Sequence, residues 1–534
     1  MTEWQTQSRI PLKHFYTNED VRNLDYQESL SDPGSFPFTR GRRLDLHPGA
    51  AWIQRELSGE GDPLTSNAQF KYLLAMGQTG LDVIGDTPSV GLIDPDHPFA
   101  KYTVGNQGVS ICCLQDYRDL HKDIPLDKIT ISYSLPASFA AAGLYLIAQE
   151  NGISPSKLRG SVIQGPLYGE DCGYAVHLPI SLRLRMSSNC VEFCSKEMPK
   201  YHHFVEDTYY FSEAGLDSIE EMALGFVEIR CIIRDLLNRG VNIDSFAPRI
   251  AILINCRMDF FEEIAKVRAT RRLFSRMIKE EYGAKDPRSW AVVITCHTSG
   301  LSLTAQQPVN NIVRGAIESL ALAIAGVQAI EISAFDEAYR TPSPESHFIA
   351  LRTQQIIQSE SNVTKVMDPL GGSYYVEALT DEIEKRIWEM VLKIEAMGDP
   401  AHLSEKGIFR SIFTNAMERY AKEIKEKKLL KVGVNIYEIP EEKDTLLKEV
   451  AERKIEPYLD RIEKIKEFKK SRDQKKLKQV LEGCYQKAKD KDENLMYPII
   501  KATEGGGTMG EIAGVMRMAY GFDYDPYGMI KSPI

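Results

Sequence analysis

Short apolar runs, rich in β-branched residues, alternate with longer amphipathic stretches between residues 80 and 345. Runs of this kind predict buried strands, and the stretches between them predict helices. Eight strands that alternate with helices predict an α/β fold, a (β/α)8 barrel with catalytic groups at the carboxyl ends of the strands. The strand candidates are 81–85, 109–113, 129–134, 160–164, 205–210, 249–254, 291–295 and 327–332.

The clearest helix candidate is the stretch SIEEMALGFVEIRCIIRDLL at 218–237, where apolar residues recur every three or four positions. Asp217 or Ser218 is suited to cap its first turn.

One strand candidate is unusually polar, because ITISYS at 129–134 alternates Thr130, Ser132 and Ser134 with larger residues. Small polar side chains lining a barrel would let a ligand enter along its axis. A strand that partly faces solvent explains the same pattern equally well.

The pattern divides the chain into three parts. Residues 1–79 form an N-terminal extension, 80–345 the barrel, and 346–534 a helical C-terminal region.

The extension carries FPFTRGRRLDLHPG at 36–49, where Arg40, Arg42, Arg43 and His47 are suited to bind phosphates or a carboxylate. A solvated basic loop is the simpler alternative.

Two adjacent tyrosines, Tyr209 and Tyr210, end the fifth strand candidate in VEDTYYFSEAG. In a strand their rings would point to opposite faces. One phenol would then lie in the core and the other in the active site.

Composition narrows the function classes. The net charge of −10 argues against a general nucleic-acid binder. Nine cysteines without any CxxC spacing indicate buried thiols in a reducing cytoplasm and no metal site. The N-terminus has no signal-peptide pattern, and no apolar stretch is long enough to span a membrane. We therefore expect a cytoplasmic protein.

Longer strings along the chain together resemble the catalytic chain of the adenosylcobalamin-dependent acyl-CoA mutases, the methylmalonyl-CoA mutase family. They include PFTRG (37–41), DPDHP (94–98), the YYFSEAG block (209–215), FAPRI (246–250), TSGLSLTAQQPVNNIVR (298–314), FDEA (335–338), DPLGGSYYVEALT (368–380) and GTMGEI (507–512). They occur in the family's order over nearly the whole chain.

The resemblance implies a barrel whose axis admits the pantetheine arm of an acyl-CoA substrate. It implies adenosylcobalamin held mainly by a separate small subunit, because the D-x-H-x-x-G cobalt-ligating motif is absent from this sequence. The expected assembly is a heterotetramer, with a GTPase chaperone as a further partner and no nucleic acid or membrane.

The resemblance also implies site residues. Catalytic roles fall on Tyr210, at the place of the family's histidine, and on His47 and His297. Cofactor contacts fall on Tyr209, Ser333 and Glu337. Substrate or CoA contacts fall on Arg40, Arg43, Asp82, Ile84, Asp86, Ser161, Gln164 and Arg249.

The acyl pocket departs from the malonyl-type pattern, because QGPLYGEDCGYAVHL at 164–178 contains no arginine or lysine for a second carboxylate. A buried carboxylate without a partner would cost several kcal/mol. We therefore expect a hydroxylated, branched or bulky acyl-CoA of the 2-hydroxyisobutyryl type, and not methylmalonyl-CoA. The alternatives are a dicarboxylic acyl-CoA mutase and a non-catalytic CoA-binding relative.

Overall fold

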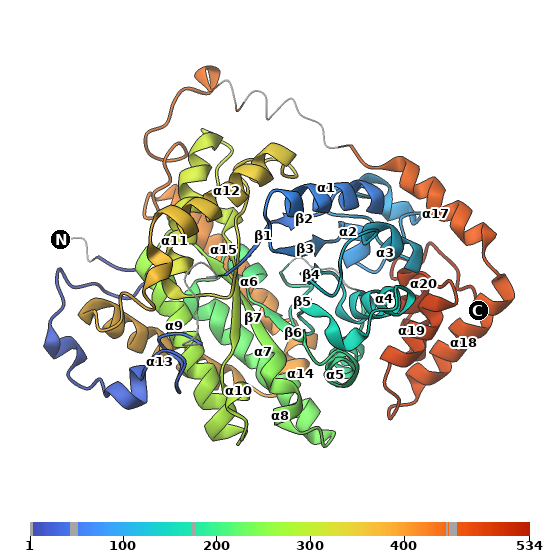
Figure 1. The fold of residues 1–534 in the computed structure, drawn as a ribbon, viewed down its shortest axis with the longest axis horizontal. Coiled ribbons are helices and arrows are strands. Elements are labelled where there is room, and N and C mark those ends of the chain that lie inside the picture. Colours follow the sequence, from blue (N-terminus) through green and yellow to red (C-terminus); the bar gives the residue numbers. More distant parts are fainter. Residues whose placement is uncertain (1–3, 43–51, 173–176, 445–446, 448–455) are drawn as a thin grey trace. The chain divides into compact units, whose positions relative to one another are not determined.

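The computed structural model describes residues 4–42, 52–172, 177–444, 447 and 456–534. Within them the fold is α/β, as predicted: a barrel-like parallel sheet of nine strands with helices around it and further helices toward the C-terminus (Figure 1). The strands follow the order β1-β9-β8-β7-β6-β5-β4-β3-β2. They are β1 Ile53–Arg55, β2 Leu57–Ser58, β3 Gly80–Ile84, β4 Thr130–Ser134, β5 Arg159–Gln164, β6 Tyr201–Asp207, β7 Ile250–Cys256, β8 Val293–Thr298 and β9 Ala329–Glu331.

The chain divides into two compact units. Unit 1 contains 1–56 and 206–453, and unit 2 contains 57–205 and 454–534. Unit 1 has the helices α6 Tyr209–Glu213, α7 Ser218–Asn238, α8 Ile243–Phe246, α9 Phe260–Arg276, α10 Pro287–Trp290, α11 Asn311–Ala325, α12 Pro344–Glu360, α13 Tyr374–Glu395, α14 Pro400–Glu405 and α15 Ile408–Lys425. Unit 2 has α1 Pro63–Ala75, α2 Thr87–Val90, α3 Leu114–Leu120, α4 Ala137–Glu150, α5 Ile180–Glu197, α17 Leu459–Ser471, α18 Gln474–Lys489, α19 Met496–Glu504 and α20 Met509–Ala519.

Seven of the eight strand predictions are confirmed, with boundaries shifted by a few residues. The prediction at 109–113 was wrong. Val109 makes only isolated bridges, to Gly61 and Gly85, before Cys113 caps helix α3. Val109 and Ile111 are fully buried, so the run is apolar because it is a buried loop, which periodicity cannot distinguish from a strand. Strands β1 and β2 were missed because they are too short to show a pattern.

The helix prediction at 218–237 is confirmed by α7. The Asp217 carboxylate accepts hydrogen bonds from the backbone N–H groups of Ile219 and Glu220, each at 3.0 Å, and therefore caps the first turn.

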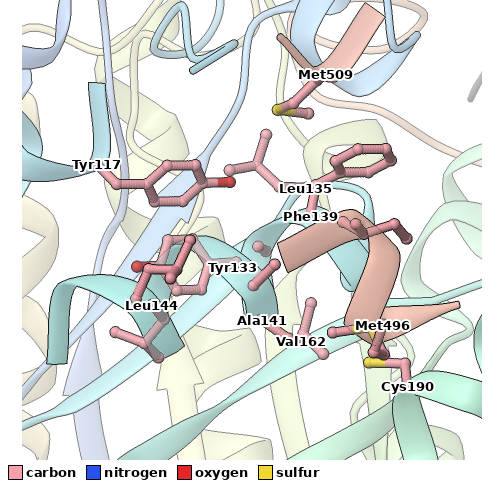
Figure 2. Close-up of a cluster of buried hydrophobic side chains, with 14 of the residues drawn as sticks. Tyr117, Tyr133, Leu135, Phe139, Ala141, Leu144, Val162, Cys190, Met496 and Met509 are labelled. Atoms are coloured by element: carbon pink, nitrogen blue, oxygen red, sulfur yellow. The ribbon is translucent and has the colours of Figure 1, made fainter. Parts of the chain in front are cut away.

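Strands β3 to β5 of unit 2 have one apolar and one polar face. Leu81, Val83, Ile131, Tyr133 and Val162 belong to a buried cluster that also takes in Met496 and Met509 from α19 and α20 (Figure 2). The alternate positions include small polar residues, and the register aligns Asp82, Ser132 and Ser161 in one row. Ser132 Oγ lies 2.5 Å from Ser161 Oγ.

The GTMGEI string opens helix α20 and holds a carboxylate from the DPDHP string. Asp94 accepts hydrogen bonds from the Thr508 hydroxyl (2.5 Å) and the Gly510 N–H (3.0 Å). The Lys469 ammonium lies 2.9 Å from the same side chain. A side chain at position 510 would approach Asp94 Oδ1 to 2.8 Å, so glycine keeps this helix end accessible to Asp94. Two of the strings that carry the family resemblance therefore form one packing contact.

No helix among the described residues is both long enough and apolar enough to cross a membrane.

We predict that Phe139→Ala lowers the free energy of unfolding by about 3–5 kcal/mol, because Phe139 is 2% exposed and its loss leaves a cavity in the cluster of Figure 2. Urea denaturation measures the change. Phe522→Ala is the matched control in the same unit, since Phe522 is 52% exposed, and it should stay within about 0.5 kcal/mol of the wild type. Equal losses from both substitutions would contradict the assignment of this core.

Candidate active site

One row of residues across four neighbouring strands of unit 1 is polar. The register pairs Arg55 of β1 with Glu331 of β9, Glu331 with His297 of β8, and His297 with Asn255 of β7. Registered neighbours in a parallel sheet point to the same face. All four stand at the carboxyl ends of their strands or one residue before, where barrel enzymes carry their catalytic groups.

The predicted catalytic residue His297 lies against a buried carboxylate of this row. Its Nε2 lies 2.9 Å from Glu331 Oε2, and the two side chains are 5% and 2% exposed. The Arg55 guanidinium lies 3.7 Å from the other carboxylate oxygen.

The tyrosine pair does not end a strand, contrary to our prediction. Strand β6 stops at Asp207, where the Thr208 hydroxyl donates a hydrogen bond to the Leu253 carbonyl at 2.9 Å, and Tyr209 begins the short helix α6. The rings of Tyr209 and Tyr210 therefore lie at 86° to each other with centroids 5.4 Å apart, and do not point to opposite faces of a strand.

Tyr209 contacts the row directly. Its ring centroid is 4.8 Å from that of His297, and its side chain is within hydrogen-bonding reach of Ser333. Burial, together with the nearby Glu213 and Glu337 carboxylates, raises the pKa of the Tyr209 phenol well above its usual value. The phenol therefore remains a hydrogen-bond donor at neutral pH. Tyr210 is half-buried beside it.

Glu213 was not predicted as a site residue. Its carboxylate accepts hydrogen bonds from Asn255 Nδ2 (2.7 Å), Ser299 Oγ (2.5 Å) and the Leu301 backbone N–H (2.9 Å). A side chain on Gly300 would come within 2.9 Å of this carboxylate. Glu213 stands four residues after Tyr209, on the same side of a helical turn. This spacing is the signal that could have identified Glu213 from the sequence.

Ser333 and Glu337 follow β9 and lie close to the row. Ser333 Oγ donates to the Thr298 carbonyl at 2.8 Å, and Glu337 Oε2 accepts from the Ala334 N–H at 3.0 Å. Burial raises the pKa of Glu337 to about 7, although the nearby His297 acts in the opposite direction.

A further carboxyl group, Glu56, follows β1. It accepts a hydrogen bond from Gln354 Nε2 at 2.9 Å, and Gln354 in turn accepts one from the Trp52 indole at 3.0 Å. Burial, and then the Glu331 and Glu337 carboxylates, raise the pKa of Glu56 well above its usual value. We call Glu56, Glu213, Glu331 and Glu337 the acidic cluster.

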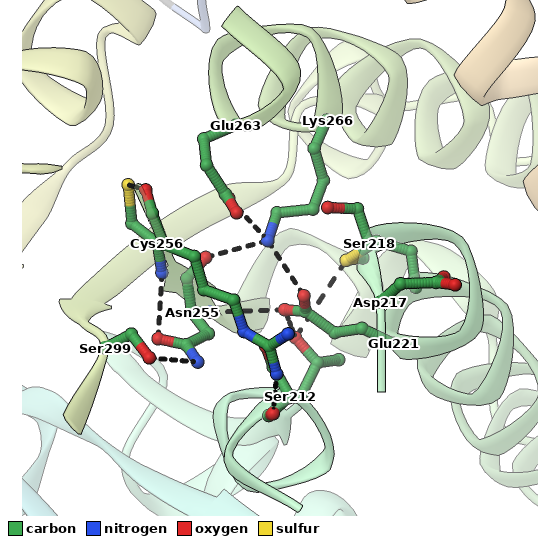
Figure 3. Close-up of polar contacts among 12 residues, drawn as sticks. Ser212, Asp217, Ser218, Glu221, Asn255, Cys256, Glu263, Lys266 and Ser299 are labelled. Carbon is green, nitrogen blue, oxygen red and sulfur yellow. Dashed lines mark hydrogen bonds and ion pairs between the residues drawn. The ribbon is translucent and has the colours of Figure 1, made fainter. Parts of the chain in front are cut away.

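A buried lysine supports the row from the side of helix α9 (Figure 3). Lys266 Nζ donates to the Asn255 carbonyl at 2.8 Å and pairs with Glu221 (2.8 Å) and Glu263 (2.7 Å). Glu221 also accepts hydrogen bonds from the Asn255 N–H and the Thr208 hydroxyl. These contacts hold the ends of β6 and β7, and thereby the residues that position Glu213 and Tyr209.

The other predicted residues of unit 1 lie outside this row. Arg40 Nε is 2.9 Å from Asp368 Oδ2, and its guanidinium donates to the Tyr26 hydroxyl at 3.1 Å. Arg249 precedes β7, and its pKa is lowered by burial and by the neighbouring Arg288. Arg43 and His47 lie outside the described residues.

The predicted residues of unit 2 lie on or just after strands β3 and β5. Ser134 Oγ lies 3.4 Å from Asp82 Oδ1, Gln164 Nε2 donates to the His203 carbonyl at 2.6 Å, and Ile84 closes β3. The fourth, Ser161, is the partner of Ser132 described above.

Asp86, also in unit 2, caps α2 through Ser89 and accepts the Gly105 N–H at 2.6 Å. Burial raises the pKa of its carboxyl group to about 6.

One group of side chains in unit 2 has metal-ligating atoms close together, formed by Cys112, Cys113 and Asp116. The Arg461 guanidinium donates to the Asp116 carboxylate and lies 3.5 Å from Cys112 Sγ. A cationic side chain therefore already occupies the position that a metal ion would take.

The profile of the methylmalonyl-CoA mutase family matches residues 5–522. The chain is 32% identical to the 2-hydroxyisobutanoyl-CoA mutase large subunit of Aquincola tertiaricarbonis, over 97% of this chain and 92% of that protein. It is 34% identical to the methylmalonyl-CoA mutase of Rhizobium meliloti, over 98% of this chain and 73% of that enzyme.

The chain belongs to the methylmalonyl-CoA mutase family. The human mitochondrial methylmalonyl-CoA mutase is 33% identical over 97% of this chain and 68% of its own length. The predicted family is therefore confirmed, and the relatives are acyl-CoA mutases by name.

We predict that Lys266→Met lowers the free energy of unfolding by roughly 3–5 kcal/mol, because it leaves two buried carboxylates without their cation. Chemical denaturation measures the loss. Lys385→Met is the control, since Lys385 lies 4.0 Å from Glu389 with both side chains 64% exposed, and it should change stability by less than about 1 kcal/mol.

We predict a pH-dependent stability contribution from Glu337. Because its folded-state pKa is about 7 and the ordinary value is 4.5, the folded protein binds this proton more tightly than the unfolded chain. The contribution is therefore greatest at low pH and is lost as pH rises from about 4.5 to about 7. The loss is at most about 3 kcal/mol, and water access to the partly exposed side chain reduces it.

Urea unfolding of the wild type and of Glu337→Gln between pH 5 and 8 tests this contribution. The stability advantage of the wild type over the variant should shrink up to pH 7 and then level off. Parallel stability curves would contradict the prediction.

Proposed function

We propose that this chain is the substrate-binding subunit of a coenzyme B12-dependent mutase that rearranges the carbon skeleton of an acyl-CoA by 1,2-migration of the thioester carbonyl. The observation that carries the proposal is the gathering of Tyr209, His297, Ser333 and Glu337 at the strand ends of a chain that belongs to this family. These are the residues for which the family resemblance predicts catalytic and cofactor roles.

The proposed substrate is a hydroxylated, branched or bulky acyl-CoA and not methylmalonyl-CoA. The acidic cluster concentrates four carboxyl groups around the row, and Arg55 already lies next to Glu331. A second free carboxylate on the acyl group would lose its hydration there, and this loss costs several kcal/mol unless a cation offsets it. The segment 164–178 provides no arginine or lysine to offset that cost. The relative from Aquincola is named for a hydroxyacyl thioester.

Adenosylcobalamin is the proposed cofactor. The donors and acceptors near the row fit a polar, hydroxyl-bearing group, because the Glu337 carboxyl group is an acceptor with a pKa near neutrality and Tyr209 and Ser333 carry hydroxyl groups. When bound, this cofactor supplies the radical chemistry that begins the rearrangement. The chain's own residues orient the thioester, donate hydrogen bonds to its oxygens and exclude water.

The proposed partner is a small cobalamin-binding subunit. The relative from Aquincola, which this chain matches over 92% of that protein's length, is named a large subunit. We further propose that the two subunit types form a heterotetramer, with a GTPase chaperone as an additional partner.

Among individual residues, we propose that Tyr210 and His297 donate hydrogen bonds to the acyl thioester, together with His47. Arg40, Arg43 and Arg249 would contact CoA. The polar strand residues Asp82, Ser161 and Gln164, with Ile84 and Asp86, would line the substrate's path.

Turnover of a panel of acyl-CoA thioesters tests the function. The chain is mixed with its small subunit and adenosylcobalamin, and products are separated by mass spectrometry. We expect isomerisation of hydroxylated or branched acyl-CoAs and none of methylmalonyl-CoA. Activity restricted to malonyl-type thioesters would refute the substrate proposal, and binding of CoA thioesters without isomerisation would favour a non-catalytic relative.

Replacement of Tyr210 by phenylalanine tests the site. Removal of a hydrogen-bond donor from the reacting group should lower kcat/KM by roughly 10²–10⁴-fold. Tyr437→Phe serves as the control, because Tyr437 is 80% exposed in the same unit and its loss should leave kcat/KM unchanged. Full activity of Tyr210→Phe would remove Tyr210 from the catalytic site.

A further inference from the structure

Glu331 is a member of the polar row that was not predicted from the sequence, and it is the one that lies next to the predicted catalytic residue His297 as a carboxylate. It is a carboxylate in the middle of a sheet, 2% exposed, next to His297 on one side and Arg55 on the other. A buried carboxylate is retained at such a place only with compensation, because its desolvation costs several kcal/mol. The structure provides that compensation through two cationic or protonatable neighbours at 2.9 and 3.7 Å.

The charge balance of the surroundings favours a protonated imidazole. Among the described residues of unit 1, three titratable groups that lie near His297 are Glu331 from β9, Glu337 from the segment after β9, and the Tyr209 phenol from α6. Two of the three are carboxyl groups, and the third is a neutral phenol. Arg55 is the nearby permanent cation and lies against the far oxygen of Glu331. A negative charge within about 4–6 Å favours the charged form of histidine, whereas burial opposes it.

The position of His297 is set by the sheet. Ile294 and Cys296 are buried neighbours along β8, whereas Thr295 and His297 alternate with them and point to the face that carries Asn255 and Glu331. The Tyr209 ring packs at 4.8 Å against the imidazole and limits its rotation. An imidazolium held in this way offers two N–H donors, of which one faces Glu331.

We propose that Glu331 is a positioning residue that keeps His297 protonated, so that the imidazolium donates a hydrogen bond to an oxygen of the bound acyl thioester. The inference rests on the proposed function for its substrate. The acceptor is either the thioester carbonyl, which every acyl-CoA carries, or a hydroxyl group on the acyl chain. No proton is transferred in this role, since the imidazolium acts as a hydrogen-bond donor and remains charged.

The first experiment follows the titration of His297 by NMR in the full chain labelled with ¹⁵N-histidine, with the His297 signal assigned by its absence in His297→Gln. In the wild type, His297 should remain protonated above the ordinary histidine pKa of about 6.5. In Glu331→Gln the midpoint should fall by roughly one to three pH units, and Glu331→Asp should retain most of the wild-type value. An ordinary midpoint in the wild type, or an unchanged midpoint in Glu331→Gln, would overturn the proposal.

Glu377→Gln is the matched control. Glu377 is another buried carboxylate of unit 1 and forms an ion pair with Arg268, far along the chain from the row. Its replacement should destabilise the protein in the same way as Glu331→Gln but leave the His297 midpoint unmoved. A similar shift in both variants would mean that Glu331 acts only through general stability, and would overturn the proposal.

The second experiment measures kcat/KM against pH for a hydroxylated and a non-hydroxylated branched acyl-CoA. Glu331→Gln should move the loss of activity on the alkaline side to lower pH and reduce kcat/KM at pH 8 by about 10²-fold or more. Equal reductions for both substrates support the thioester carbonyl as acceptor, and a reduction confined to the hydroxylated substrate supports the hydroxyl group. If kcat/KM falls at the same alkaline pH in the wild type and in Glu331→Gln, the proposal is overturned. If no thioester is turned over even by the wild type, the proposed function fails, whereas the NMR titration still decides whether Glu331 controls the charge of His297.

Discussion

The register of four parallel strands in unit 1 is the constraint on which the candidate site depends. Because neighbouring strands pair residue for residue, Arg55, Glu331, His297 and Asn255 form one row on one face. A slip of one residue in β7 or β9 would turn Asn255 or Glu331 to the other face and bring an isoleucine or a cysteine into the row. The alternation of apolar and polar positions along β8 therefore does two things: it anchors the strand in the core, and it places the imidazole beside a carboxylate.

The electrostatics of the site follow from that placement. Carboxyl groups that are brought together out of water must be protonated, paired or hydrogen-bonded. Each solution occurs here. The pKa of Glu337 rises to about 7, Glu331 lies between His297 and Arg55, and Glu213 accepts three hydrogen bonds. Lys266 provides the same compensation for Glu221 and Glu263 below the row. The result is a polar centre surrounded by an apolar shell. It is suited to bind neutral or hydrogen-bond-accepting parts of a ligand.

Several parts of this arrangement were predictable. The periodicity of the apolar runs identified most strands and helix α7, and the ordered strings identified the family. Other predictions from the local sequence were wrong or incomplete. The run at 109–113 is apolar because it is a buried loop, and Tyr209 lies in a helix because the Thr208 hydroxyl bonds to the Leu253 carbonyl of another strand. Glu213 escaped prediction because its hydrogen-bond donors come from β7 and from the loop after β8.

The sequence by itself determined the class of the protein: a parallel α/β chain of one mutase family, without a basic group in the segment expected to bind a second carboxylate. These properties depend on residue identity and local periodicity, which are readable along the chain. Only the tertiary structure decided that His297 pairs with Glu331 and that Lys266 supports Asn255. Such pairs are set by strand register and helix packing between residues far apart in the chain, and local periodicity contains no information about them.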